Sequence, residues 1–198
     1  MIDLAAVVVL SFQAAILGTL IEALRRRDVA AAVNALVALL VGLLPVAVEL
    51  ASPGGSVAVG TALPLWLAVA GLLHSLGMLG LYDSTWWWDH VTHTVSASLV
   101  AALSYAAALA GVLSFELAPG VAAVATLAVT LLLGVGWELV ELVSRHVAER
   151  YDVEPVLVHY GWADTGYDLL FDVVGAALVV AADLRIFVPL VERLSAAA

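Results

Sequence analysis

One stretch decides both the fold and the candidate site: Trp86-Trp87-Trp88-Asp89-His90-Val91-Thr92-His93. A cluster of tryptophans is followed at once by an acid and two imidazoles, and together they open a long apolar run. Ionisable side chains at the edges of apolar spans are costly, so they indicate a function or a specific partner. Two later stretches carry polar residues in similar positions: Gly136-Trp137-Glu138-Leu139-Val140-Glu141, and Asp164-Thr165-Gly166-Tyr167-Asp168 with Asp172.

The composition around this stretch is that of a membrane protein. Of the 198 residues, 64% are hydrophobic and 12% are charged, whereas a soluble domain is about half apolar and about a quarter charged. Apolar runs recur at the length that crosses a bilayer, about 20 residues per helix, and they lack the alternation of barrel strands. The sequence predicts an all-α polytopic protein of the cell membrane, with residues 1–198 forming a single integral membrane domain, a six-helix bundle.

Charge and cysteine content exclude several kinds of site. The net charge is -10 at pH 7, and all seven basic residues are arginine. Such acidity argues against nucleic acid as a partner and against tight adhesion to anionic headgroups. Because the chain has no cysteine, neither a disulfide nor a thiolate metal site can form. Membrane lipids are therefore the expected partners.

Six membrane spans are expected, at about residues 2–24, 29–50, 61–81, 89–113, 121–143 and 164–188. The fifth could continue as a helix to Glu149, and a turn-forming outer loop is expected at 52–56. Basic residues follow the first apolar core instead of preceding it, which argues against a signal peptide. If positive charge stays in the cytoplasm, both termini lie outside. The inner loops then hold five of the seven arginines: Arg25, Arg26, Arg27, Arg145 and Arg150.

The polar residues of three spans are expected to form one site. Alternate crossings place the start of the fourth span, the end of the fifth and the start of the sixth on one face of the membrane, whichever side is cytoplasmic. At about 1.5 Å per residue, their depths overlap within one leaflet. Facing lipid would leave charge in hydrocarbon, so these stripes should face one another. Each set shares one helical stripe: Asp89 with His93, Glu138 with Glu141, and Asp164 with Asp168 and Asp172.

Other side chains near this layer allow simpler interpretations. His74, late in the third span, can reach the layer from a fourth helix, whereas His90 lies about 60° off the His93 stripe. Asp164 and Glu141 lie nearest the interface and are more simply interpreted as helix caps or headgroup contacts. The three tryptophans are most simply interpreted as an aromatic belt. Small residues would let neighbouring backbones approach closely: Gly134, Gly136 and Gly175.

The leading hypothesis is a metal-dependent hydrolase or transferase acting on lipid headgroups or a membrane-associated small molecule. Carboxylates with imidazoles and no thiol suit a divalent metal such as Zn, Mn or Mg. Crowded acids in a low dielectric also need protons or a cation to offset their charge, and a metal could activate water. The predicted metal ligands are Asp89, His93, Glu138 and Asp168, and the predicted catalytic residues are Glu138, Asp168 and Asp172. The surrounding polar layer comprises His74, His90, Glu141 and Asp164.

Two other classes of function stay open. Stacked carboxylates and histidines also serve proton- or cation-coupled carriers, although carrier sites lie near the midplane of the membrane. The third class is a non-catalytic membrane scaffold whose polar cluster specifies helix packing. A deep route lined from the site to the far side would favour the carrier. A pocket closed at the midplane but open sideways to lipid would favour the enzyme.

The C-terminal half also carries a combination of motifs: Tyr82-Asp83, Asp89-His90-x-x-His93, Trp137-Glu138-x-x-Glu141 and Asp164-Thr165-x-x-Asp168-x-x-x-Asp172-x-x-Gly175-Ala176. From about Tyr82 to Ala177 the chain thereby resembles the YjdF-type inner-membrane proteins and, more distantly, VanZ-like membrane proteins, which are linked to glycopeptide-antibiotic resistance. The resemblance implies a multi-pass membrane protein and supplies no established reaction. It matches the family histidine to His93, the paired acids to Glu138 and Glu141, and the aspartates to Asp164 and Asp168. The chain departs from the family pattern in having Asp172 in place of an asparagine.

Overall fold

The computed structural model describes residues 4–52, 58–112, 117–158 and 160–197, and every regular element in these ranges is a helix. The predicted all-helical class is confirmed. The elements are α1 (Leu4–Arg26), α2 (Val29–Ala51), α3 (Ala62–Leu76), η2 (Gly77–Leu81), α4 (Tyr82–Ser84), α5 (Trp88–Leu109), α6 (Pro119–Tyr151), α7 (Trp162–Ala181) and α8 (Val188–Ala197). Apart from Ser52, the predicted loop at 52–56 lies outside the described residues, as does the end of the predicted fourth span.

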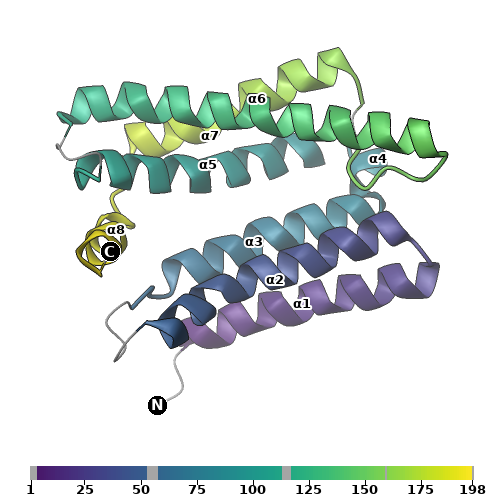
Figure 1. Cartoon of the computed structure of the whole chain (residues 1–198), viewed down its shortest axis with the longest axis horizontal. Coiled ribbons are helices and arrows are strands. Elements are labelled where there is room, and N and C mark those ends of the chain that lie inside the picture. Colours follow the sequence, from purple (N-terminus) through teal and green to yellow (C-terminus); the bar gives the residue numbers. More distant parts are fainter. Residues whose placement is uncertain (1–3, 53–57, 113–116, 159, 198) are drawn as a thin grey trace.

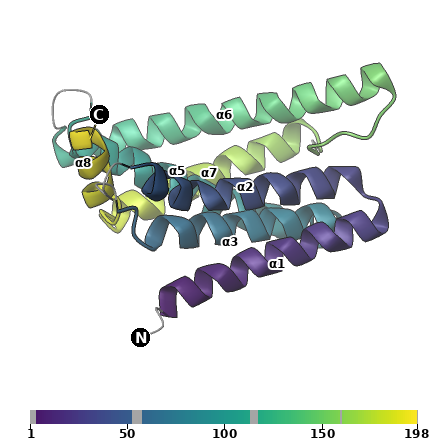
Figure 2. The same cartoon turned by 60° about the horizontal axis from the view of Figure 1, so that its bottom comes forward.

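The long helices form two groups of three (Figure 1). The N-terminal group consists of α1, α2 and α3, which pack against one another, and the C-terminal group of α5, α6 and α7. The two groups meet mainly along α3 and α5, and the short α8 packs against α5. Turned by 60°, the molecule has α1 and α6 on opposite sides with the other long helices between them (Figure 2).

Five stretches are long and apolar enough to cross a membrane: α1, α2, the run Ala62–Ser84, α5 and α6. A multi-pass membrane protein is thereby supported, but the predicted count of six spans is not reached. The exception is α7, which carries three aspartates within its 20 residues. It nevertheless packs along both α5 and α6, and Asp168 and Asp172 point into the protein, where they are buried.

Two helix ends differ from the expected spans for local reasons. α6 runs for 33 residues from Pro119 through Glu149 to Tyr151, about 50 Å, so it exceeds the roughly 30 Å hydrocarbon core. α7 ends at Ala181, well before residue 188. Asp183 there has a left-handed backbone (φ 48), and its N–H bonds to the carbonyl of Val180, as in a common helix C-cap.

The third span bends near its end. Gly80 has φ 118, a conformation that glycine adopts at little cost. The bend folds the ring of Tyr82 back onto Gly77, where a Cβ atom would collide with it. The Tyr82 hydroxyl thereby reaches the Nδ1 atom of His74 at 2.8 Å. A helix that continued straight would not bring these two side chains together.

Exposed aromatic side chains gather at the end of the bundle where α5 and α7 begin and α6 ends. Trp86 and Trp162 are 82% and 78% exposed, and Trp87, Tyr151 and Tyr167 are also exposed. Aromatic side chains at one level are typical of the boundary between hydrocarbon and water. This gathering is the one that a membrane interface at this end of the C-terminal group would produce.

Candidate functional site

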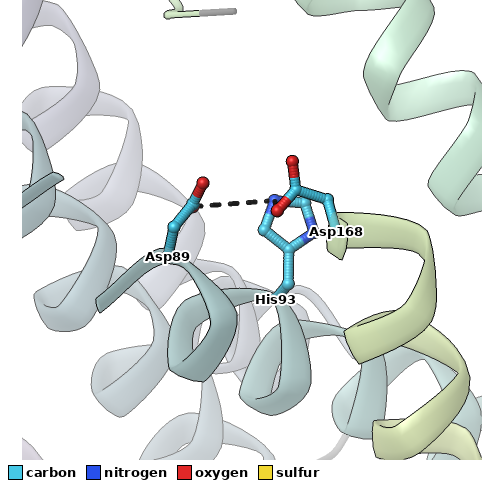
Figure 3. A group of neighbouring side chains, drawn as sticks. All are labelled: Asp89, His93 and Asp168. Atoms are coloured by element: carbon cyan, nitrogen blue, oxygen red, sulfur yellow. Dashed lines mark ion pairs between the residues drawn. The ribbon is translucent and has the colours of Figure 1, made fainter. Parts of the chain in front are cut away.

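His93 lies at the centre of a cluster of three aspartates supplied by α5 and α7. Its Nε2 atom is 3.8 Å from Oδ1 of Asp89, one turn earlier on α5, and 3.8 Å from Oδ1 of Asp168 on α7. Its Nδ1 atom is 3.1 Å from Oδ1 of Asp172. Figure 3 shows the side chains of Asp89, His93 and Asp168 converging from the two helices. These four residues are called the Asp/His cluster below.

Asp172 determines which way the His93 ring faces. With Nδ1 hydrogen-bonded to Asp172, the opposite nitrogen, Nε2, faces Asp89 and Asp168. A carboxylate on one nitrogen commonly fixes the tautomer and orientation of a metal-binding histidine. Asp172 is 5% exposed and lies against Gly134 of α6, where a Cβ atom would collide with its carboxylate.

The close approaches expected at glycines occur at two of the three positions. A Cβ atom at Gly134 would meet Asp172, and one at Gly175 would meet the backbone oxygen of Thr94 on α5. At Gly136 nothing lies within 4 Å of such an atom, so the expectation there was wrong. Gly134 and Gly175 thus let α6 and α5 come close to α7 around the cluster.

The donor set of the Asp/His cluster fits a divalent cation. One ligand atom each from Asp89, His93 and Asp168 lies within 4.8 Å of the others. Ligands about 2.1 Å from a tetrahedral metal are about 3.4 Å apart, close to the two 3.8 Å separations at His93 Nε2. All three atoms lie within 4.8 Å of one another, so the carboxylates would move closer together around a bound ion. One imidazole and two carboxylates suit zinc or manganese.

Glu138, the fourth predicted ligand, is not part of the convergent group. It is 6% exposed on α6, and neither carboxylate oxygen has a hydrogen-bond partner within the described part of the chain. It interacts electrostatically with Asp89 and Asp168, so it lies near the cluster without joining it. An unpaired buried carboxylate is costly unless a proton or a cation offsets its charge.

The remaining predicted residues of the polar layer lie in different surroundings. Glu141 accepts a 2.9 Å hydrogen bond from Nε1 of Trp137. Asp164 lies in the first turn of α7, where the helix dipole favours a carboxylate. His90 does not join the layer: its ring stacks on Phe171 with centroids 4.4 Å apart. Its offset from the His93 stripe turns it towards α7 aromatics and away from the cluster.

A cavity of about 530 Å³ lies between the two helix groups. Its polar end contains Asp89, His93, Glu141 and Asp172. Along α5 its wall extends from Asp89 to Val100, about 16 Å at 1.5 Å per residue, so it reaches roughly the middle of the helix. The deeper walls are mostly apolar: Val37, Val41, Leu67, Leu99, Val100 and Leu133.

The wall opposite the cluster has a neutral polar network. His74 shares hydrogen bonds with Oδ1 of Asn34 at 2.9 Å and with the hydroxyl of Tyr82 at 2.8 Å. Because an amide oxygen only accepts, His74 Nε2 is the donor to Asn34. The amide of Asn34 in turn donates to the carbonyl of Val156 at 2.6 Å. Sequence reasoning gave Asn34 and Tyr82 no place in the site, although one asparagine in an apolar span was an available signal.

The described residues between α6 and α7, 152–158 and 160–161, cover the polar end of the cavity. Leu157, Val158 and Tyr160 contribute to its lining. The Tyr160 hydroxyl donates to Asp83 at 2.7 Å, and partial burial together with this hydrogen bond raises the pKa of Tyr160. The backbone N–H of Leu157 donates to the hydroxyl of Ser144. The segment is thereby attached to both helix groups.

The sequence profile of a family described as "Predicted membrane protein (DUF2238)" matches residues 4–188. Its match covers both helix groups and both walls of the cavity. Neither the curated proteins nor the solved structures include a significant match to this chain. The resemblance to YjdF-type and VanZ-like proteins continues to depend on the C-terminal motifs alone.

Proposed function

The chain belongs to the DUF2238 family of predicted membrane proteins, and from the geometry of the Asp/His cluster we propose that it is a metal-dependent hydrolase or transferase. Asp89, His93 and Asp168 would hold the metal, and the substrate would be a lipid headgroup or another membrane-associated molecule. The observation that supports this proposal most strongly is the convergence of three ligand atoms within 4.8 Å. The cavity beside them has a polar end and mostly apolar deeper walls, so it has room for a polar head and an apolar tail.

In this proposal each acid has a separate role. The metal would lower the pKa of a bound water, which then attacks the substrate. Asp172 would orient His93 through Nδ1, a role supported by their 3.1 Å contact. Glu138, a buried acid without a partner, would accept the proton of that water. The leaving group would take up this proton, so the acid is restored for the next cycle.

The proposed arrangement in the membrane has six crossings, with α7 as the sixth and both termini outside. Two features support it: the length of α7, and the arginines at the ends of α1 and α6, which lie on the side of the Asp/His cluster. Arginine-rich ends usually face the cytoplasm. The site would then act at the level of the headgroups in the inner leaflet of the cell membrane.

Metal analysis of the purified protein tests the proposal. We expect about one zinc or manganese ion per chain in the wild type, none in His93→Ala, and wild-type content in His90→Ala. The His90 variant is a matched control because it removes an imidazole three residues away that faces Phe171. Absence of metal from all three proteins, purified without chelator and after metal addition, would refute the metalloenzyme.

A coupled carrier is the second candidate, supported by one row of polar residues on α6. Thr126, Thr130 and Glu138 follow one another at intervals of four and eight residues along α6 and are buried, and their side-chain oxygens have no partner within the described ranges. The row extends over 12 residues, about 18 Å, and could hold water or ions. Proton uptake into proteoliposomes that is lost in Glu138→Gln, in protein without bound metal, would favour the carrier over the enzyme.

A further inference from the structure

The described lining of the cavity between the helix groups contains several acids and two imidazoles, His74 and His93, but no arginine. The acids are Asp89, Glu141 and Asp172. The chain contains no lysine that could reach it. An anionic headgroup would find only these imidazoles, of which His74 is hydrogen-bonded to Asn34 and Tyr82 and His93 lies among three carboxylates. Buried acids are themselves stabilised by a cation.

Outside the Asp/His cluster, Glu141 is the lining carboxylate best placed to pair with an organic cation. Its Oε1 atom accepts the hydrogen bond of Trp137, and its Oε2 atom has no hydrogen bond in the part of the chain that the structure describes. The rings of Trp137, Tyr82 and Tyr160 line the same end of the cavity. Aromatic faces attract organic cations, tryptophan most strongly. A carboxylate beside several aromatic rings thus matches an ammonium group.

The deeper part of the cavity matches one hydrocarbon chain. Apolar side chains of four helices surround it, among them Val41, Leu67, Val100 and Leu133. The wall between Asp89 and Val100 is about 16 Å long, and pockets of about 300–1,000 Å³ typically hold one small ligand. The 530 Å³ of this cavity therefore suits an extended single chain.

We infer that the cavity binds a single-chain amphiphile with an ammonium head, the head at Glu141 and the chain between the two helix groups. As the substrate class of the enzyme, this inference rests on the proposed function. Binding itself does not need the metal, since the ammonium head pairs with Glu141, which is outside the convergent ligand group. An ammonium head bound there lies beside the Asp/His cluster, which shares the polar end.

Electron paramagnetic resonance in nanodiscs of zwitterionic lipid tests the inference. The probes are three dodecyl compounds with a nitroxide at the chain end and an ammonium, a hydroxyl or a phosphate as head. We expect the wild type to immobilise the ammonium probe about tenfold more tightly than the hydroxyl probe, the effect of one charge-assisted hydrogen bond. Glu141→Gln should lose this preference. Glu149→Gln should keep it, because Glu149 is exposed and pairs with Arg145 on the same helix.

A second variant tests the position of the chain. Val100→Phe shortens the apolar compartment and should shift the preference from dodecyl towards octyl ammonium, while the charge preference stays. The inference is overturned if the phosphate probe binds best, or if Glu141→Gln and Glu149→Gln have equal effects.

Measuring the metal content of the same samples distinguishes failure of the proposed enzyme from failure of the inferred ligand. Ammonium preference without bound metal refutes only the enzyme, and bound metal without ammonium preference refutes only the inferred ligand.

Discussion

The two walls of the cavity use histidine in opposite ways. On the C-terminal group, His93 lies among three carboxylates. On the N-terminal group, His74 lies between two neutral partners, Asn34 and Tyr82. A histidine among acids can carry a proton or bind a metal, whereas neutral hydrogen bonds satisfy the uncharged ring. In the proposed function the chemistry would therefore belong to the C-terminal group, while α2 and α3 shape the opposite wall of the cavity.

The largest effect is expected where the acidic wall is assembled, at the contact between α5 and α7. Gly175→Leu would push a side chain into the backbone oxygen of Thr94 and the Ser98 backbone on α5. Because backbone cannot yield as a flexible side chain does, we expect a loss of about 3 kcal/mol or more in stability. Thermal unfolding in detergent measures it, and metal content should fall with the fold.

Gly136→Ala is the matched control for this substitution. An added Cβ atom at Gly136 has open space, and alanine favours a helix over glycine by about 1 kcal/mol. The control should therefore unfold at the wild-type temperature or slightly above it. Equal destabilisation by both substitutions would show that the α5–α7 contact is not special.

The next largest effect is expected from a substitution that changes metal binding on the α5–α7 side of the cavity and leaves the helix packing intact. Asp172→Asn keeps a hydrogen-bond acceptor for His93 Nδ1 but removes the charge behind the ring. If His93 binds a metal through Nε2, we expect metal affinity to fall about tenfold, as for other outer-shell partners. Competition with a metal-sensitive dye measures it. Asp164→Asn, outside the cluster, should leave the affinity unchanged, and an equal fall in both variants would contradict the role of Asp172.

The sequence predicted the helical class, and it also predicted the polar stripes. The 3.6-residue periodicity determines which face of a helix a polar residue occupies, and alternate crossings determine at which end of the bundle it lies. Asp89, His93, Asp168 and Asp172 meet because their spacing of four residues places each pair on one face. Their depth agrees because helix ends share the interface. The function of these residues is a separate matter, which spacing leaves open.

What the sequence did not indicate depends on contacts distant along the chain. Asn34 meets His74 through the packing of α2 on α3, and it meets Val156 of the connection between α6 and α7, whereas the bend at Gly80 brings Tyr82 to His74. The aspartates that define the site also lower the apolarity of α7. By composition α7 is therefore not a candidate membrane span, although Asp168 and Asp172 are buried in the bundle. The end of α7 at Ala181 depends on the backbone of Asp183, which no hydrophobic pattern encodes.

On the neutral wall, Asn34→Leu should destabilise the protein without affecting the metal. The substitution leaves His74 Nε2 and the carbonyl of Val156 without their partner, and an unsatisfied buried group costs about 1–3 kcal/mol. Leucine recovers part of this by adding apolar contact, so the net loss should be near the lower value. Thermal unfolding and metal analysis of the same sample check both expectations. A loss of metal would show that the two walls act together.

The smallest effect is expected far from both walls, at the end of α7. Arg185 and the hydroxyl of Tyr105 hydrogen-bond to Asp183 and hold its pKa below the ordinary 3.8. A carboxyl whose folded pKa is depressed stabilises the fold above its unfolded pKa, and this contribution is lost as pH falls through the folded pKa. Asp183→Asn keeps the left-handed backbone that asparagine tolerates. The wild type should therefore unfold at a higher temperature than the variant at about pH 6, and the two should converge as the pH falls through the folded pKa of Asp183. Because the pair is exposed, about 1 M salt should shrink the difference. A difference that persists in acid and in salt would assign the effect to the helix cap instead of the charge.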